Sequence, residues 1–456
     1  MNLQDTVAMI ILMVLLVVLL VGAFHFWMQK STVTNNKQAM VAHTTPKEVV
    51  PAGKDNPFEL PLQQYHAAAL TRALVSSTNE FSIMLLRAMP PLVASPASVV
   101  AVLTTLYAGV KPYSETQRQL KRALNFYNEH VWQQIDSSQL MIFLQRWQNH
   151  LVHTGVEINN VLFLNDRWQL QPRFEQHALI QSCFAVLRGP GDAHDERRLN
   201  DWAAKHTHGK NSQLLPPNTL DRDTALVLIN TISFKSNWKV AFDKDLSHKR
   251  PFISCDGRSR LQTMMRMQDK RHYYFDGGNF QLLELMYANE AVRFGVFLPD
   301  YARGVDTHNV CKFAAHSLQP AIESLRWLEV GELQLPRFKQ RHRMELTSFL
   351  KALGAKRLFD SVRGAELDQI IVLPASAASP QQNNVVFVSD VIHEAVIAVD
   401  ETGTEAAAAT AVVVQATNMT LPPSGQHRIR FVADHSFVFY LRHVPTNTML
   451  FVGFYD

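Results

Sequence analysis

The sequence predicts an α+β fold with substantial antiparallel sheet, and three observations support this class. Apolar residues recur at helical spacing over 70–86 and 97–107. Runs rich in β-branched and apolar residues are typical of strands. These runs lie at 226–234, 293–298, 328–335 and 385–388. The two kinds of segment mix without strict alternation and without an internal repeat, so a repeating βαβ architecture is not predicted.

Two further segments complete the predicted elements. Residues 115–126 open with charged side chains and are typical of a surface helix. Residues 431–454 are apolar or alternating on both sides of Pro445-Thr446-Asn447. This pattern predicts a terminal β-hairpin with a turn at the proline.

Composition excludes several classes of protein. The 456 residues are 47% hydrophobic and 18% charged, as in ordinary globular chains, although this length could hold about three average domains. The net charge of +4 argues against nucleic-acid binding. Cys183, Cys255 and Cys311 are too few for a disulfide framework, and no C-x-x-C pair exists. We therefore predict no metal site and no cofactor.

An apolar segment near the N-terminus, 8–27, is long enough to span a bilayer. No Asp, Glu, Lys or Arg occurs between Asp5 and Lys30, and Phe26 and Trp27 suit a membrane interface. A cleaved signal peptide would have basic residues before a shorter apolar run. Residues 1–28 are therefore predicted to be a transmembrane signal-anchor, with a cleaved signal peptide or a buried soluble helix as alternatives.

Residues 29–60 are polar and lack periodicity, which predicts a flexible stalk or, alternatively, an extended strap on the globular part, 61–456. Lys30, Lys37 and Lys47 follow the apolar segment and favour a cytoplasmic globular part. Large folded domains, however, often translocate despite such weak charge biases. We expect a membrane-anchored or secreted protein with an extracellular or lumenal domain, and leave the cytoplasmic orientation open.

The sequence carries no recognisable catalytic motif. G-x-S-x-G, the phosphate-binding G-x-x-x-x-G-K and H-E-x-x-H are all absent. His393-Glu394 begins like the zinc motif, but Ile397 stands where the second histidine would be. His206 and His208 have the spacing of solvent-facing residues more than of metal ligands. We therefore predict that the chain is not an enzyme.

A basic cluster is formed by Lys339, Arg341, His342 and Arg343. Such a run usually forms a solvated edge, and weak polyanion binding is the alternative.

The most unusual stretch is 396–420, which combines four consecutive alanines with Val412-Val413-Val414. Taken alone, the alanines are compatible with a short helix capped by Thr402 or Thr404. The valine triplet is strongly strand-forming and does not fit that helix. A loop whose small side chains could also enter a crowded sheet interior explains the whole stretch better.

Residues 401–411 read Glu-Thr-Gly-Thr-Glu-Ala-Ala-Ala-Ala-Thr-Ala. This segment resembles the reactive-loop hinge of inhibitory serpins almost residue for residue. Other motifs similar to those of the family follow in order: Ser-Pro-Ala-Ser at 95–98, Asn-Asp-Trp at 200–202, Thr-His-Gly-Lys at 207–210, and the segments 228–238, 335–339, 388–395, 431–437 and 450–453. The resemblance covers Gln63 to Asp456.

The resemblance implies one folded unit with three β-sheets, a cap of helices and an exposed reactive-centre loop at about 401–430. It also assigns a polar shutter under the main sheet and a breach, where insertion begins, at Trp238. The shutter residues are Ser95, Ser98, Asn230 and His393. The hinge residues are Glu401, Gly403, Thr404, Glu405, Ala406, Ala407, Ala408, Ala409 and Thr410.

The implied mechanism is suicide inhibition of a serine protease, the expected partner. The protease would form its acyl ester on the loop, which would then insert as a strand into the main sheet. Thr404, Ala406, Ala408 and Thr410 share one face of that strand, and none is charged, which favours an inhibitory chain. A non-inhibitory serpin acting as a carrier, chaperone or binding protein, and a membrane-bound hydrolase, are the alternatives.

The family's spacing places the scissile bond at Thr417–Asn418, with Met419 as the second choice. A small β-branched residue suits a shallow elastase-like pocket better than an acidic or aromatic one. Asn418-Met419-Thr420 is also an N-glycosylation acceptor. A glycan on Asn418 would obstruct docking if the domain faced the secretory lumen.

Overall fold

The computed structural model describes residues 63–88, 93–126, 137–175, 184–206, 214–306, 309–372, 385–404 and 428–456. Every described residue belongs to one compact unit, Leu60–Asp456. The predicted anchor, 1–28, and stalk, 29–60, lie outside the described residues. Among the helices of the described part, none combines the length and apolar character that a membrane span requires.

The predicted helices are present. The longer helices are α2 (Gln63–Ala88), α3 (Pro96–Gly109), α4 (Glu115–Ala123), α6 (Ser137–Val152), α9 (Ala193–His206) and α10 (Val310–Ser324). The short ones are α7 (Pro172–Glu175), α11 (Thr347–Ala352), η1 (Tyr301–Arg303) and η3 (Arg357–Phe359). Helix α4 ends earlier than predicted because Asn125 adopts a positive φ of 56°, and the amide of Phe126 bonds back to Lys121.

The largest sheet has nine strands and includes the C-terminus. Its path is β1 (Val93–Ala94), β18 (Thr448–Tyr455), β17 (Phe437–His443), β10 (Val292–Pro299), β9 (Phe280–Met286), β8 (Ser259–Asp276), β11 (Arg326–Pro336) and β16 (Ile429–Val432), with β7 (Asp243–Ile253) paired to β8. The predicted terminal hairpin is therefore β17–β18. Its turn carries Asn447 at a φ of 56°, a conformation that asparagine tolerates.

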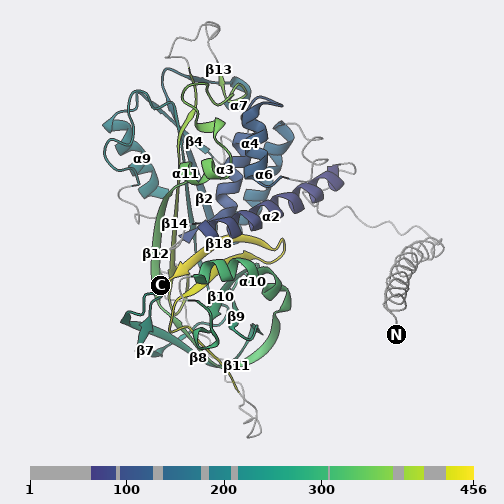
Figure 1. Cartoon of the computed structure of the whole chain (residues 1–456), viewed down its shortest axis with the longest axis vertical. Coiled ribbons are helices and arrows are strands. Elements are labelled where there is room, and N and C mark those ends of the chain that lie inside the picture. Colours follow the sequence, from purple (N-terminus) through teal and green to yellow (C-terminus); the bar gives the residue numbers. More distant parts are fainter. Residues whose placement is uncertain are drawn as a thin grey trace, which may run out of the picture. The chain divides into compact units, whose positions relative to one another are not determined.

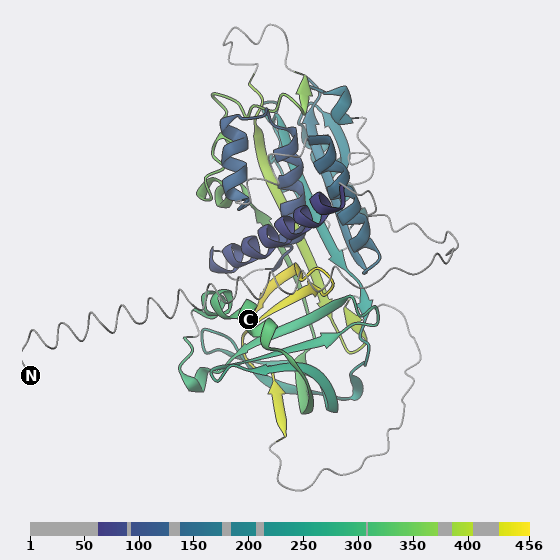
Figure 2. The same cartoon turned by 90° about the vertical axis from the view of Figure 1, so that its right-hand side faces the viewer.

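The second sheet has seven strands and runs through the helical end of the domain (Figure 1). Its path is β4 (Phe184–Gly189), β2 (Val156–Asn165), β5 (Leu226–Phe234), β14 (Val388–Val399), β15 (Gly403–Thr404) and β6 (Ser236–Asn237), with β12 (Phe338–Glu345) paired to β14. A third sheet joins β3 (Gln169–Leu170) to β13 (Ile371–Val372). Helices α3, α4, α6 and α9 lie at one end of the domain, and β7, β8 and β11 lie at the other (Figures 1 and 2).

Strand β5 is buried along its whole length because both of its faces are covered. Leu226 and Leu228 belong to the main core. Val227 and Ile229 point to the other face, where they pack in a separate cluster with Leu199 of α9. This two-sided burial explains the continuous apolar run that predicted the strand.

A second predicted boundary, besides the end of α4, is wrong. The strand predicted at 385–388 begins only at Val388 and continues to Val399, because the carbonyl of Val386 accepts the amide of Ala365, in a loop. Of the loop predicted at about 401–430, only 401–404 and 428–430 lie among the described residues. Gly403–Thr404 already form β15, and β16 begins at Ile429.

Candidate functional site: the loop hinge and the polar cluster beneath the sheet

Strands β5 and β14 are direct neighbours and run parallel, with Leu228 opposite Val391 and Asn230 opposite His393. Their other long neighbours, β2 and β12, are antiparallel to them. A strand running opposite to both could pair antiparallel with each of them only if β5 and β14 moved apart.

Two predicted hinge residues, Gly403 and Thr404, form the short strand β15 beside β14. Thr404 pairs with Val399 of β14 on one side and with Ser236 of β6 on the other. Gly403 pairs with Asn237. Since β6 follows β5 in the chain after one residue, β15 starts a strand between the extensions of β5 and β14.

Asp400 reverses the chain before β15. Its Oδ1 accepts the amides of Thr402 and Gly403, at 2.8 and 3.0 Å, and its own amide donates to the carbonyl of Gly403. Gly403 is required for close approach, because a Cβ there would lie 2.2 Å from the carbonyl oxygen of Ser236 and 2.7 Å from Cα of Asn237. Both are backbone atoms that cannot rotate away.

Trp238, the predicted breach residue, donates two hydrogen bonds to this turn. Its Nε1 donates to the carbonyl of Asp400 at 2.8 Å, and its amide donates to the carbonyl of Thr402 at 2.9 Å. The indole stacks on Tyr287 with ring centroids 4.4 Å apart. The Tyr287 hydroxyl in turn lies 2.5 Å from Oγ1 of the fully buried Thr404. Burial raises the pKa of Tyr287 well above its usual value.

The predicted hinge residue Glu401 is buried, with 5% of its surface exposed. Its Oε1 accepts the hydroxyl of Ser247 at 2.9 Å, and its Oε2 lies 3.7 Å from a guanidinium nitrogen of Arg337. Its carbonyl accepts the amide of Phe242. The start of the loop is therefore fixed through both side chain and backbone.

The structure brings the four predicted shutter residues into one buried network. His393 Nε2 accepts the amide of Ser95 at 2.9 Å, and His393 Nδ1 lies 2.6 Å from Oδ1 of Asn230. The Ser98 hydroxyl donates to the same Oδ1 at 2.7 Å. Asn230 Nδ2 donates to Oδ1 of Asn160 at 2.5 Å. The network joins the N-terminus of α3 to β2, β5 and β14.

This network determines the protonation of His393. A backbone amide can only donate, so Nε2 must be the acceptor and Nδ1 carries the single proton. Burial, with a smaller contribution from the nearby His342, lowers the pKa of His393 to about 3. The imidazole is therefore neutral at physiological pH.

Sequence reasoning missed Asn160 and Tyr287. Asn160 carried a signal, since it is a buried amide within the apolar strand β2. Tyr287 carried none, because its role depends on contacts with residues 49 and 117 positions away.

The basic cluster on β12 is only partly solvated. Arg341 Nε pairs with Glu394, whose side chain is fully buried, and burial raises the pKa of that carboxyl. Arg343 Nε donates to the carbonyl of Leu214 at 2.5 Å. Two of the four basic residues therefore make contacts within the domain, and this argues against polyanion binding by the cluster.

One group of potential metal ligands occurs in the part of the chain that the structure describes, formed by Asp192, His194 and Asp195. Both carboxylates accept backbone amides at the start of α9. They therefore act as helix caps.

The remaining predicted site residues lie outside the described residues. These are Glu405, Ala406, Ala407, Ala408, Ala409, Thr410, Thr417, Asn418 and Met419.

Comparison with known proteins identifies the fold. Residues 76–455 match the serpin family, described as serine protease inhibitors. The chain belongs to the serpin family. It is 31% identical to human Serpin B8 over 364 residues, covering 79% of this chain and 91% of that protein. It is 29% identical to bovine leukocyte elastase inhibitor, with the same coverage of each chain.

Solved serpin structures share the architecture. Arabidopsis AtSerpin1 in its native stressed conformation superposes with a TM-score of 0.66 at 24% identity, covering 88% of this chain and 98% of that one. The thermophilic serpin tengpin in its native state gives a TM-score of 0.69, with 89% and 95% coverage. The predicted α+β serpin fold with three sheets is confirmed. Serpins are protease inhibitors, so the chain is not an enzyme.

Proposed function

We propose that this serpin inhibits serine proteases by inserting its cleaved loop between β5 and β14. The observation that supports this most directly is the position of β15, where Thr404 is paired on both sides between β14 and β6. Insertion would therefore extend an existing strand and would not have to nucleate a new one.

The register supports insertion without slippage. Continuing the pairing of Thr404 with Val399 places Thr410 opposite His393 of β14. Continuing the pairing of Thr404 with Ser236 places Thr410 opposite Asn230 of β5. His393 and Asn230 are already opposite each other, so the two independent registers agree.

The inward face of the extended strand suits the space beneath it. Thr404 is fully buried, and by period two Ala406, Ala408 and Thr410 would share its face. At Thr410 the new strand would separate His393 Nδ1 from Asn230 Oδ1, which now lie 2.6 Å apart. The threonine hydroxyl can both donate and accept, so it could replace the lost hydrogen bond.

Insertion is favourable because it converts one parallel pairing into two antiparallel ones. Residues 405–414 would gain backbone partners on both sides, at about 1 kcal/mol of net stabilisation per hydrogen bond. A protease attached as an acyl ester would be carried along with the loop. Inhibition requires insertion to be faster than hydrolysis of that ester.

We propose Thr417–Asn418 as the scissile bond and an elastase-like enzyme as the target. A small β-branched residue fits a shallow specificity pocket. The bovine relative, named leukocyte elastase inhibitor, agrees with this choice. We further propose that 8–27 anchors the chain in a membrane with the serpin domain outside the cytoplasm. In that location the glycosylation acceptor Asn418 would have to remain unglycosylated, because a glycan there would obstruct docking of the protease.

A panel of serine proteases tests the proposal. The expected result is an SDS-stable covalent complex with an elastase-like member and release of a C-terminal peptide beginning at Asn418. A peptide beginning at Thr420 would move the scissile bond to Met419, and an attached sugar would argue against inhibition at this site. Rapid loop cleavage by every protease without complex would instead indicate a non-inhibitory serpin.

A further inference from the structure

Strand β7 contacts the chain on both sides of the predicted reactive loop, at Glu401 and at Asp434 beyond β16. Near its start, the Ser247 hydroxyl donates to Oε1 of Glu401 at 2.9 Å, just before the loop. Farther along, Arg250 donates to Oδ2 of Asp434 at 2.7 Å, and the Ile253 amide donates to the carbonyl of Asp434, two residues after β16. A protein docked on the loop would therefore lie close to β7.

The inner face of the β7–β8 hairpin is firmly attached to the domain. Phe252 is fully buried, and its ring centroid lies 5.0 Å from that of Tyr455. The Arg260 guanidinium lies 4.6 Å from the centroid of Phe252 and donates to the carbonyl of Asp456 at 2.7 Å. The opposite face of the hairpin therefore has a defined orientation toward solvent.

That opposite face is apolar. Leu261 is 70% exposed and Ile253 is 49% exposed. Leu261 pairs directly with Pro251, which is also exposed, so Ile253 and Leu261 are diagonal neighbours on one face. Single exposed apolar residues are ordinary, but three neighbours on a rigid hairpin indicate a contact surface.

The hairpin that carries this face is net basic. Residues 243–276 contain eight Lys and Arg against five Asp and Glu. Lys249, which precedes Pro251 by two residues on the same strand, is exposed and therefore shares its face. A partner with an apolar patch bordered by acidic residues would be complementary.

We propose that Lys249, Pro251, Ile253 and Leu261, hereafter the outer hairpin face, form an accessory contact for the target protease while it docks on the loop. The partner's identity as a protease rests on the function proposed above. Because the outer hairpin face lies outside the inserting strand, it would govern the rate of association and not the fate of the acyl ester.

The test compares I253S/L261S and K249E with the unmodified domain against a panel of elastase-like serine proteases. With the fastest-reacting protease, each variant should lower the association rate constant, about tenfold or more for the double variant. The effect of K249E should shrink as salt is raised. The stoichiometry of inhibition should not change.

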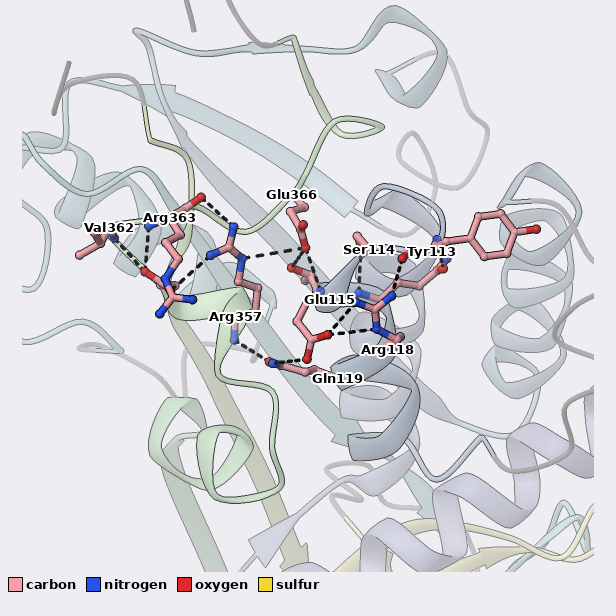
Figure 3. Close-up of polar contacts among 12 residues, drawn as sticks. Tyr113, Ser114, Glu115, Arg118, Gln119, Arg357, Val362, Arg363 and Glu366 are labelled. Carbon is pink, nitrogen blue, oxygen red and sulfur yellow. Dashed lines mark hydrogen bonds and ion pairs between the residues drawn. The ribbon is translucent and has the colours of Figure 1, made fainter. Parts of the chain in front are cut away.

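A matched control is Y113S/V362S. Tyr113 and Val362 are 88% and 81% exposed. They flank a polar groove of about 470 Å³ between α4 and residues 356–363, at the end of the domain away from β7 (Figures 1 and 3). This variant should associate at the normal rate.

The outcomes separate this proposal from the inhibitory function. If no protease forms a covalent complex, the proposed inhibitory function is contradicted. The rate at which a protease cleaves the loop then still measures how well it docks. The outer hairpin face is then supported only if its variants lower kcat/KM for that cleavage. Unchanged rates with every protease would overturn the proposal. A dimer that the I253S/L261S variant dissociates would also overturn it, because the face would then bind a second copy of the chain.

Discussion

His393 and Asn230 face each other across the parallel β5–β14 pair, with His393 Nδ1 2.6 Å from Asn230 Oδ1. This hydrogen bond stands where an inserted strand would have to pass. The other ring nitrogen of His393, Nε2, accepts the amide of Ser95 and ties the sheet to the N-terminus of α3. The contact between His393 and Asn230 therefore stabilises the closed sheet and opposes its opening.

The first prediction concerns pH. The pKa of His393 is about 3 in the folded protein and near its ordinary 6.5 when unfolded, so between these values the unfolded chain binds one more proton. The contribution of neutral His393 to the free energy of unfolding is therefore fully present above pH 6.5. It is lost as the pH falls below that value, by up to about 1.4 kcal/mol per pH unit. Urea denaturation midpoints should therefore fall between pH 7 and 5.

His393→Gln isolates this residue. A glutamine amide can accept from Ser95 and donate to Asn230 but does not titrate. The pH dependence should become shallower without vanishing, because burial also lowers the pKa of His272 to about 4. An identical slope in both proteins would contradict the role of His393.

The second prediction concerns the inserting face. Thr410→Arg should leave the rate of loop cleavage unchanged but abolish the covalent complex, because burying an unpaired guanidinium delays insertion beyond ester hydrolysis. The stoichiometry of inhibition should rise at least about tenfold, since each 1.4 kcal/mol added to the barrier slows insertion tenfold. Thr410→Ser is the control and should inhibit normally. Thr404→Arg should act similarly, but Thr404 is already buried against Tyr287, so its effect on the native fold would have to be measured too.

The third prediction concerns loop cleavage. Cutting the chain within 412–418 should raise the thermal denaturation midpoint by roughly 10 °C or more, because about ten residues gain partners on both sides. Melting curves before and after limited proteolysis provide the measurement. The cleaved Thr410→Arg variant should show a much smaller gain, and an unchanged midpoint in the unmodified protein would contradict insertion.

The fourth prediction concerns Gly403. A methyl group there would approach the backbone of Ser236 and Asn237 within 2.2–2.7 Å, so Gly403→Ala should displace β15. The loop would then have to start its insertion from an unpaired end. We expect a native state less stable by about 1–3 kcal/mol and a higher stoichiometry of inhibition. Thr402→Ala, which removes only a hydroxyl bond to Asp400, should have a smaller effect on both measurements.

The sequence by itself determined the local elements, and it predicted a hinge. Buried strands such as β5 were recognisable because an unbroken apolar run is a local signal. The hinge was predicted from the resemblance of 401–411 to the serpin hinge, a motif contained within a dozen neighbouring residues. The end of α4 and the start of β14 were misplaced, because a single asparagine conformation and one contact with a distant loop decided them.

Only the tertiary structure decided that β5 and β14 are parallel neighbours and that Thr404 is already paired between β14 and β6. It alone placed Asn160 in the polar network and Tyr287 beneath the hinge. These contacts join residues 70–163 positions apart. Side-chain periodicity reports which face of an element is buried, but the partner on the other side of that face depends on how distant segments pack together.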